Sequence, residues 1–352
     1  MKFLKIFAWI ILVLVAVYLL GPRPSAPAFT NANYSKELKA IETKGADLEK
    51  MVANGEAMHK IKKDNEARII WQNDSLKNQT EYAIVYLHGF SASQEEGEPV
   101  HRNIAKKFGC NLYLSRLADH GLDTSEIFLN FTVDKYWESA KDALSIGEAL
   151  GKKVILMATS TGASLALQLA ALYPQRVHAL LLMSPNISIA DPNAWLLNNP
   201  WGLQIARLVL GSKYVDGEDQ RPIYRNYWYY HYRIEGVVQL EEYLETAMTK
   251  NTFEKVHQPM LMLYYYKDQV HQDSTVRVDA MLKMFNQLGT PSNLKRSLSM
   301  PKAGHHVIGS FIKSNDIEGV EREVEKFIIE VLKILPAKDL NAKEPSPAHE
   351  GV

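Results

Sequence analysis

The chain has 352 residues, of which 46% are hydrophobic and 23% charged, and its 40 basic side chains equal its 40 acidic ones. This length and balance suit a globular protein with a large core, and the formal net charge of zero gives no reason to expect nucleic acid as a partner. Cys110 is the single cysteine, which excludes a disulfide framework and a cysteine-based metal site.

The N-terminus has the character of a membrane segment. Residues 3–20 are apolar except for Lys5, and a helix of that length spans roughly 27 Å, close to the roughly 30 Å hydrocarbon core of a bilayer. Lys2 and Lys5 favour a cytoplasmic N-terminus, and residues 21–24, Gly-Pro-Arg-Pro, end the helix. We therefore expect residues 1–24 to form a signal anchor that leaves the rest of the chain extracytoplasmic. A cleaved secretory signal is the alternative, because residues 25–28 offer small side chains to a protease.

Two further segments flank the main domain. Residues 35–61 carry apolar side chains at roughly helical spacing, so we expect residues 25–66 to form a helical spacer or an arm packed on the domain. Residues 336–352 are rich in proline, alanine and charged side chains, and we expect a disordered tail there.

Short apolar runs alternate with longer amphipathic ones between residues 67 and 335. The expected strands are residues 83–87, 111–115, 153–158, 179–184, 260–266 and 294–300. Several are apolar at nearly every position, which is typical of strands buried on both faces of a parallel sheet. The expected helices are residues 134–150, 161–172, 279–288 and 317–335. This alternation predicts an α/β fold with a doubly wound, mostly parallel sheet.

Residues 187–257 interrupt the alternation. They contain many aromatic side chains, six of them between residues 224 and 232, and no convincing pattern of a parallel strand.

The most informative turn follows the expected strand 153–158. Ser160 lies between this strand and a helical pattern, which is the setting of a nucleophile elbow, a strained turn that presents a serine. Small residues two positions before and after the serine allow close backbone packing, and Ala158 and Gly162 occupy these positions. Alanine stands where a glycine is usual, and a plain helix N-cap at Ser160 would give a similar pattern. Ser160 is the candidate nucleophile.

A second candidate feature follows the strand 83–87, which ends in His88-Gly89-Phe90. A tight glycine turn at this place can direct a backbone amide at a developing oxyanion, and the partner amide follows the nucleophile. The candidate donors are therefore the amides of Phe90 and Thr161. An ordinary turn at the end of a strand is the alternative interpretation.

Two later loops supply an acid and a base. The strand 260–266 leads to Asp268, at the edge of the sheet where parallel sheets hold their sites. The strand 294–300 leads to His305 and His306, and adjacent residues of an extended loop point in roughly opposite directions. Apolar Val307 and Ile308 should pack inward, and we choose His306 as the base.

These motifs together resemble the α/β-hydrolase superfamily over residues 67–335, in the chain order serine, aspartate, histidine. The closest resemblance is to monoacylglycerol-lipase-like and bacterial carboxylesterase-like serine hydrolases. Residues 87–90 are similar to their oxyanion segment, residues 116–121 to their Gly-His-Gly stretch, and residues 268–270 and 306–308 to their acid and histidine motifs. Asp119 and Ala158 depart from the glycines of the pattern. The resemblance implies that residues 187–257 form a helical, aromatic-rich lid, that His306 is catalytic, and that His88 and His120 are structural.

The expected function is hydrolysis of carboxylic esters by a triad of Ser160, His306 and Asp268 through an acyl-enzyme. An aromatic lid and a membrane tether favour a lipid-like ester such as a monoacylglycerol or a lysolipid. Two alternatives keep the fold: an amide or peptide hydrolase of the serine aminopeptidase type, and a catalytically silent binding protein. We expect no cofactor, metal or nucleic-acid partner, because phosphate loops, dinucleotide fingerprints and paired histidine spacing are absent from the sequence.

Overall fold

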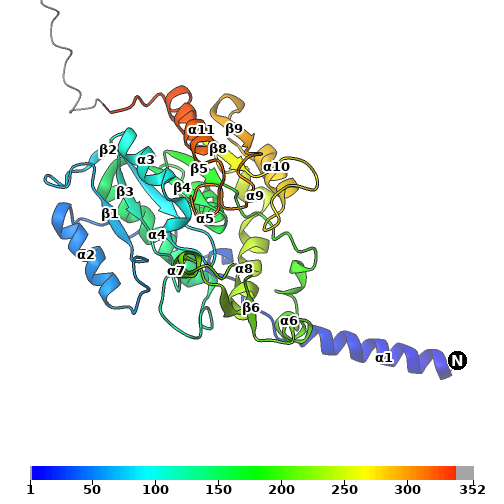
Figure 1. The fold of residues 1–352 in the computed structure, drawn as a ribbon. Helices are drawn as coiled ribbons and strands as arrows, with labels where there is room; N and C mark the ends of the chain where they lie inside the picture. Colours follow the sequence, from blue (N-terminus) through cyan, green and yellow to red (C-terminus); the bar gives the residue numbers. More distant parts are fainter. Residues whose placement is uncertain (1, 338–352) are drawn as a thin grey trace, which may run out of the picture.

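The computed structural model describes residues 2–337, and its centre is a seven-stranded sheet in the order β1-β3-β2-β4-β5-β8-β9 (Figure 1). β1 (Arg68–Ile70) runs antiparallel to β3 (Asn111–Leu114), and all other neighbouring strands are parallel. The remaining strands are β2 (Thr80–Leu87), β4 (Gly151–Thr159), β5 (Ala179–Met183), β8 (Met260–Tyr264) and β9 (Lys295–Ser299). The predicted doubly wound, mostly parallel sheet is confirmed. The sequence analysis missed β1, which has only three residues.

The core lies on both faces of the sheet, because successive side chains of a strand point to opposite sides. Val85 and Leu156 belong to one apolar cluster, whereas Ile84 and Ile155 belong to the other. The first cluster is covered by α4 (Val133–Leu150), α5 (Thr161–Leu172) and α10 (Val278–Gln287). The second is covered by α3 (Val100–Lys107) and α11 (Ile317–Glu330).

The N-terminal part comprises a protruding helix and an arm. Helix α1 (Lys2–Leu19) has no buried residue, extends away from the body of the molecule (Figure 1), and is long and apolar enough to cross a membrane. The short η1 (Ala28–Thr30) packs through Phe29 against Trp137. Helix α2 (Gly45–Ala57) packs at the edge of the sheet, where Glu49 accepts a hydrogen bond from the Trp71 indole at 3.2 Å. The predicted disordered tail lies, from residue 338 onward, outside the described residues.

Residues 187–257, here called the cap, connect β5 to β8. The cap contains η3 (Ala194–Leu196), α6 (Gly202–Leu210), α7 (Pro222–Tyr227), α8 (Ile234–Ala247) and α9 (Lys250–Phe253). It also contains an antiparallel pair, β6 (Tyr214–Asp216) and β7 (His231–Arg233). The cap is tied to the sheet edge at Tyr229, whose amide donates to the Ser91 carbonyl at 2.7 Å. Two short 3-10 helices complete the fold, η2 (Gln94–Gly97) and η4 (Ser292–Leu294).

Candidate active site

Ser160 lies on a strained turn between β4 and α5. Its backbone has φ 54° and ψ −122°, a conformation that costs free energy for a residue with a side chain. The turn is held by two hydrogen bonds: the Ser160 amide donates to the Met183 carbonyl at 2.9 Å, and the Ser160 carbonyl accepts from the Asn186 amide at 3.0 Å. A Cβ on Gly162 would lie 2.1 Å from the Leu87 carbonyl oxygen, so this position requires glycine. The local backbone is therefore that of a nucleophile elbow.

The peptide between Gly89 and Phe90 has a fixed orientation. The Gly89 carbonyl accepts from the Ala92 amide at 3.3 Å and lies 2.9 Å from Nδ1 of His88. The carbonyl and amide of a trans peptide point in opposite directions. The Phe90 N–H therefore points away from the Ala92 amide and the His88 ring, toward which the Gly89 carbonyl points. Neither the Phe90 nor the Thr161 amide donates to a backbone acceptor within residues 2–337. Both amides are available to a ligand.

The Phe90 side chain is held by aromatic rings. It stacks on Phe128 with ring centroids 4.5 Å apart and makes edge contacts with Phe131 and with Tyr232 of the cap. His88 and His120 are fully buried, and burial lowers the pKa of His88 to about 4 and that of His120 well below its usual value. Their neutral rings accept hydrogen bonds at Nε2 from the Leu117 and Ser91 amides, both at 3.1 Å.

Glu96 is a buried carboxylate that the sequence analysis did not single out. Its Oε2 accepts from the Gly89 amide at 2.5 Å, and a Cβ on Gly89 would lie 2.9 Å from both Glu96 Oε1 and Ser160 Cβ. The Cα of Gly89 therefore lies between the Glu96 carboxylate and the Ser160 side chain. Burial raises the pKa of Glu96 to about 7, against the opposing effects of the Gly89 amide, His306 and Trp228. No pattern in the sequence distinguishes Glu96 from Glu95 or Glu98.

His306 and Asp273 form a buried pair. Nδ1 of His306 lies 2.6 Å from Oδ2 of Asp273, whose side chain is inaccessible to solvent. Oδ1 of Asp273 accepts the amides of Thr275 and Val276 at 2.9 and 3.1 Å. Burial opposes both charges, but the pairing and these amides hold the pKa of Asp273 below its usual value. Burial likewise lowers the pKa of His306, whereas Asp273 and Glu96 raise it, and the net shift is upward. Nε2 of His306 is buried without a hydrogen-bond partner among the described residues.

Comparison with known proteins agrees with this architecture. The sequence profile of the family described as alpha/beta hydrolase fold matches residues 82–211, from β2 to the end of α6. A structure of one of the metagenome-derived lipolytic enzymes LipS and LipT has a TM-score of 0.61 at 16% identity, covering 76% of this chain and 99% of its own. This protein has the α/β-hydrolase fold. The resemblance inferred from its motifs is confirmed.

Two further solved structures share this α/β-hydrolase fold. The monoacylglycerol lipase of Paleococcus ferrophilus has a TM-score of 0.54 at 12% identity, covering 75% of this chain and 97% of its own. Est1E from Butyrivibrio proteoclasticus, with ferulic acid bound, has a TM-score of 0.52 at 16% identity, covering 76% and 95%. A comparison with curated protein sequences found no match. These structural likenesses, at 12–16% identity, show that the fold is shared.

The structure does not bring Asp268, the expected acid, together with His306. Its side chain is half exposed, and Oδ1 accepts from the Val270 and His271 amides at 2.9 and 2.8 Å and lies 2.9 Å from the His271 ring. Asp268 thus stabilises its own turn and does not contact His306. The loop after β8 folds back on itself and returns to the sheet edge five residues later, where the Asp273 amide donates to the Tyr265 carbonyl at 3.2 Å. The sequence shows two aspartates in this loop, but spacing alone does not reveal which one returns to the sheet.

His305 does not share the environment of His306. Nδ1 of His305 accepts from the Val307 amide at 3.0 Å, within its own turn. Burial lowers the pKa of His305 to about 4, with Lys313 and His306 adding to the effect. Within the described chain, Asp273 is bonded to His306 and not to His305.

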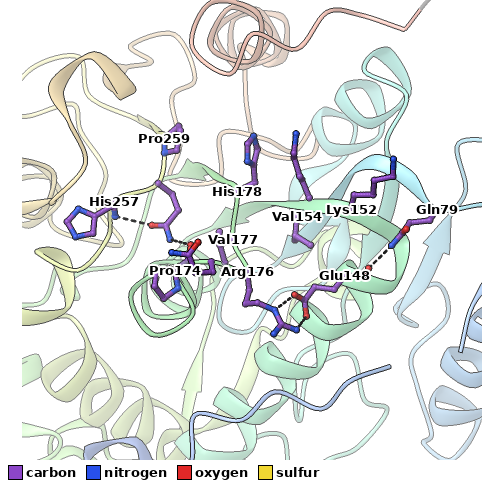
Figure 2. Close-up of a pocket in the computed structure, with 14 residues that line it drawn as sticks. Gln79, Glu148, Lys152, Val154, Pro174, Arg176, Val177, His178, His257 and Pro259 are labelled. Atoms are coloured by element: carbon purple, nitrogen blue, oxygen red, sulfur yellow. Dashed lines mark hydrogen bonds and ion pairs between the residues drawn. The ribbon is translucent and has the colours of Figure 1, made fainter. Parts of the chain in front are cut away.

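Two cavities differ in their relation to this site. The cavity in Figure 2, about 690 Å³, lies at the amino ends of the strands, lined by Val154, His178 and Pro259, whereas Ser160 follows the carboxyl end of β4. A groove of about 740 Å³ beneath the cap is lined in part by Trp228. Trp228 packs in one apolar cluster with Val307, which follows His306. Trp228 thus links a wall of this groove to the loop of His306, although neither Ser160 nor His306 lines the groove itself.

Proposed function

We propose that this protein is a serine hydrolase of carboxylic esters, with Ser160 as nucleophile, His306 as general base and Asp273 as the carboxylate that orients the base. The observation that carries the proposal is the His306–Asp273 pair at 2.6 Å, with Nε2 unpartnered, in a hydrolase fold that has a strained serine turn. Asp273 fixes the tautomer in which Nδ1 carries the proton, which leaves Nε2 free to accept one.

The reaction divides into two acyl transfers. Ser160 Oγ attacks the ester carbonyl carbon while Nε2 of His306 takes its proton, and the oxyanion accepts hydrogen bonds from the amides of Phe90 and Thr161. His306 then protonates the departing alcohol. A water molecule, deprotonated by His306, attacks the acyl-enzyme, and the collapse of the second intermediate returns the proton to Ser160 and releases the acid.

The preferred substrate class is a lipid-like ester such as a monoacylglycerol or a lysolipid. Three features support this choice: a monoacylglycerol lipase among the structural neighbours, a groove lined by Trp228, Tyr229 and Tyr230 beneath the cap, and an N-terminal helix fit to span a membrane. Helix α1 anchors the protein, with Lys2 and Lys5 on the cytoplasmic side and the hydrolase domain extracytoplasmic. Retention in the membrane after a carbonate wash at alkaline pH tests the anchor, and a mature N-terminus beyond residue 24 would contradict it.

A graded panel of p-nitrophenyl esters, assayed with the full-length protein in detergent, tests the activity. Ser160→Ala should lower kcat/KM by at least about a thousandfold and abolish fluorophosphonate labelling. Ser145→Ala is the matched control, because Ser145 is also buried but lies in α4, and its hydroxyl has no hydrogen-bond partner among the described residues. It should keep both its activity and its fluorophosphonate labelling. Faster cleavage of aminoacyl anilides than of esters would favour an amide hydrolase, and unlabelled native protein would favour a silent fold.

A further inference from the structure

Helix α6 exposes a row of apolar side chains. Leu208 and Val209 are 82% and 78% exposed, and Ile205 and Leu210 are exposed as well. Ile205, Leu208 and Val209 stand at positions i, i+3 and i+4, which lie on one face of a helix. The opposite side faces the rest of the cap, where Arg207 bonds Glu235 of α8 at 2.6 Å. The apolar face therefore points away from the protein.

The same helix begins at the end of α1. Trp201, which precedes α6, donates its indole N–H to the Val17 carbonyl and its amide to the Pro22 carbonyl, both at 2.9 Å. Its ring fills the space beside Gly21, where a Cβ would lie 2.2 Å from ring atoms. Figure 1 shows α6 at the base of the protruding α1. The surroundings of the C-terminal end of α1 are therefore also the surroundings of the exposed face of α6.

We propose that α6 is a second membrane contact. It lies in the interfacial layer of the bilayer that α1 spans, and it holds the cap against the membrane surface. This inference rests on α1 being an anchor. A tryptophan at the boundary between a spanning helix and water, followed by an amphipathic helix, matches the chemistry of the interfacial region. The cap, with the groove beneath it, then lies at the membrane surface, and an ester dissolved in the lipid reaches it without crossing bulk water.

The test uses full-length protein in phosphatidylcholine vesicles, at less than one protein per vesicle, with an environment-sensitive fluorophore on one engineered cysteine. Cys110→Ala removes the buried native thiol. The label is placed at Leu208→Cys. Leu76→Cys is the matched control, because Leu76 is an exposed leucine next to Lys77, which bonds Glu49 of α2, far from α1 in Figure 1. Val13→Cys reports on α1 itself.

We expect the label at position 208 to shift to the blue and to be quenched at least twofold by brominated lipids, and the label at position 76 to remain as in water. Quenching at position 13 without quenching at position 208 would overturn the role of α6 and leave the anchor intact. Absence of quenching at both positions would overturn the anchor. A blue shift at position 208 that brominated lipids do not quench would mean that protein, and not lipid, covers α6, and would also overturn the proposal.

Discussion

The His306 imidazole bonds Asp273 at 2.6 Å, although Asp268 is the aspartate nearer in sequence to the end of β8. The pair is buried, whereas Asp268 is half exposed and bonded to its own turn. The two aspartates of one loop therefore have separable roles, structural for Asp268 and, in our proposal, catalytic for Asp273.

Asp273→Asn should lower kcat/KM for a p-nitrophenyl ester by about 10³–10⁴, because an amide that keeps the shape no longer fixes the tautomer of His306. Asp268→Asn should stay within about threefold of the wild type, since its contacts are local. Steady-state kinetics on both variants, with circular dichroism to verify folding, checks this. If Asp268→Asn were the inactive variant, the triad proposed here would have the wrong acid.

Glu96→Gln should shift the pH profile of hydrolysis. His306 accepts a proton only when neutral, and the carboxylates of Asp273 and Glu96 both raise its pKa. The removal of this partly ionised carboxylate lowers the pKa of His306, so the acidic limb of kcat/KM should move to lower pH. A loss of activity without movement of the limb would mean that Glu96 serves only to hold the Gly89 amide.

The same substitution has a consequence for stability. The pKa of Glu96 is about 7 in the folded protein and 4.5 as a free side chain, so the folded state binds a proton more tightly than the unfolded state. Stability due to this group is fully present below pH 4.5 and is lost as the pH rises through about 7. The Tm of the wild type should therefore fall relative to that of Glu96→Gln between pH 5 and pH 8. Differential scanning fluorimetry across this range decides it, and parallel Tm curves would contradict it.

Much of this fold follows from its sequence pattern, and the reason is visible in particular strands. The segments of β2 and β4 are apolar at successive positions because both faces of the sheet are covered. That pattern can be recognised in the sequence without any knowledge of tertiary contacts. The Ser160 turn could be recognised because its constraint is local: Gly162 must pass Leu87 within a few ångströms, and no larger residue fits.

The parts of the site that could not be predicted from the sequence depend on long-range contacts. Asp273 meets His306 across 33 positions of the chain only because the loop after β8 doubles back, and nothing in its spacing states this. Glu96 is special only because it lies beneath Gly89, with Glu95 and Glu98 close by in sequence. The contact of Trp201 with α1 joins segments 184 positions apart. Such contacts are set by packing of the whole domain.

Gly162→Ala should destabilise the protein severely, by about 3 kcal/mol or more, because the new Cβ would lie 2.1 Å from a backbone oxygen of β2 that cannot move alone. Gly55→Ala is the control: a Cβ there meets nothing within 4 Å, and the residue lies inside α2. It should raise stability by about 0.5–1 kcal/mol. Thermal unfolding of both variants gives the comparison. Comparable Tm values for the two would mean that the Ser160 turn is less tightly packed than the distances indicate.

The two adjacent histidines give the sharpest test of the site. His306→Ala removes the base and should be nearly as inactive as Ser160→Ala, and the double variant should be no worse than either, because the members of a triad act as a unit. His305 bonds only the amide of its own turn, so His305→Ala should keep kcat/KM within about tenfold of the wild type. Each variant is assayed on the same p-nitrophenyl ester and titrated with a fluorophosphonate, which reports on nucleophile activation without any dependence on deacylation. Slow labelling of His306→Ala, with normal labelling of His305→Ala, is the expected pair of results. The reverse pair would assign the base to His305 and would require Asp273 to release the partner it holds at 2.6 Å, while leaving the fold unaffected.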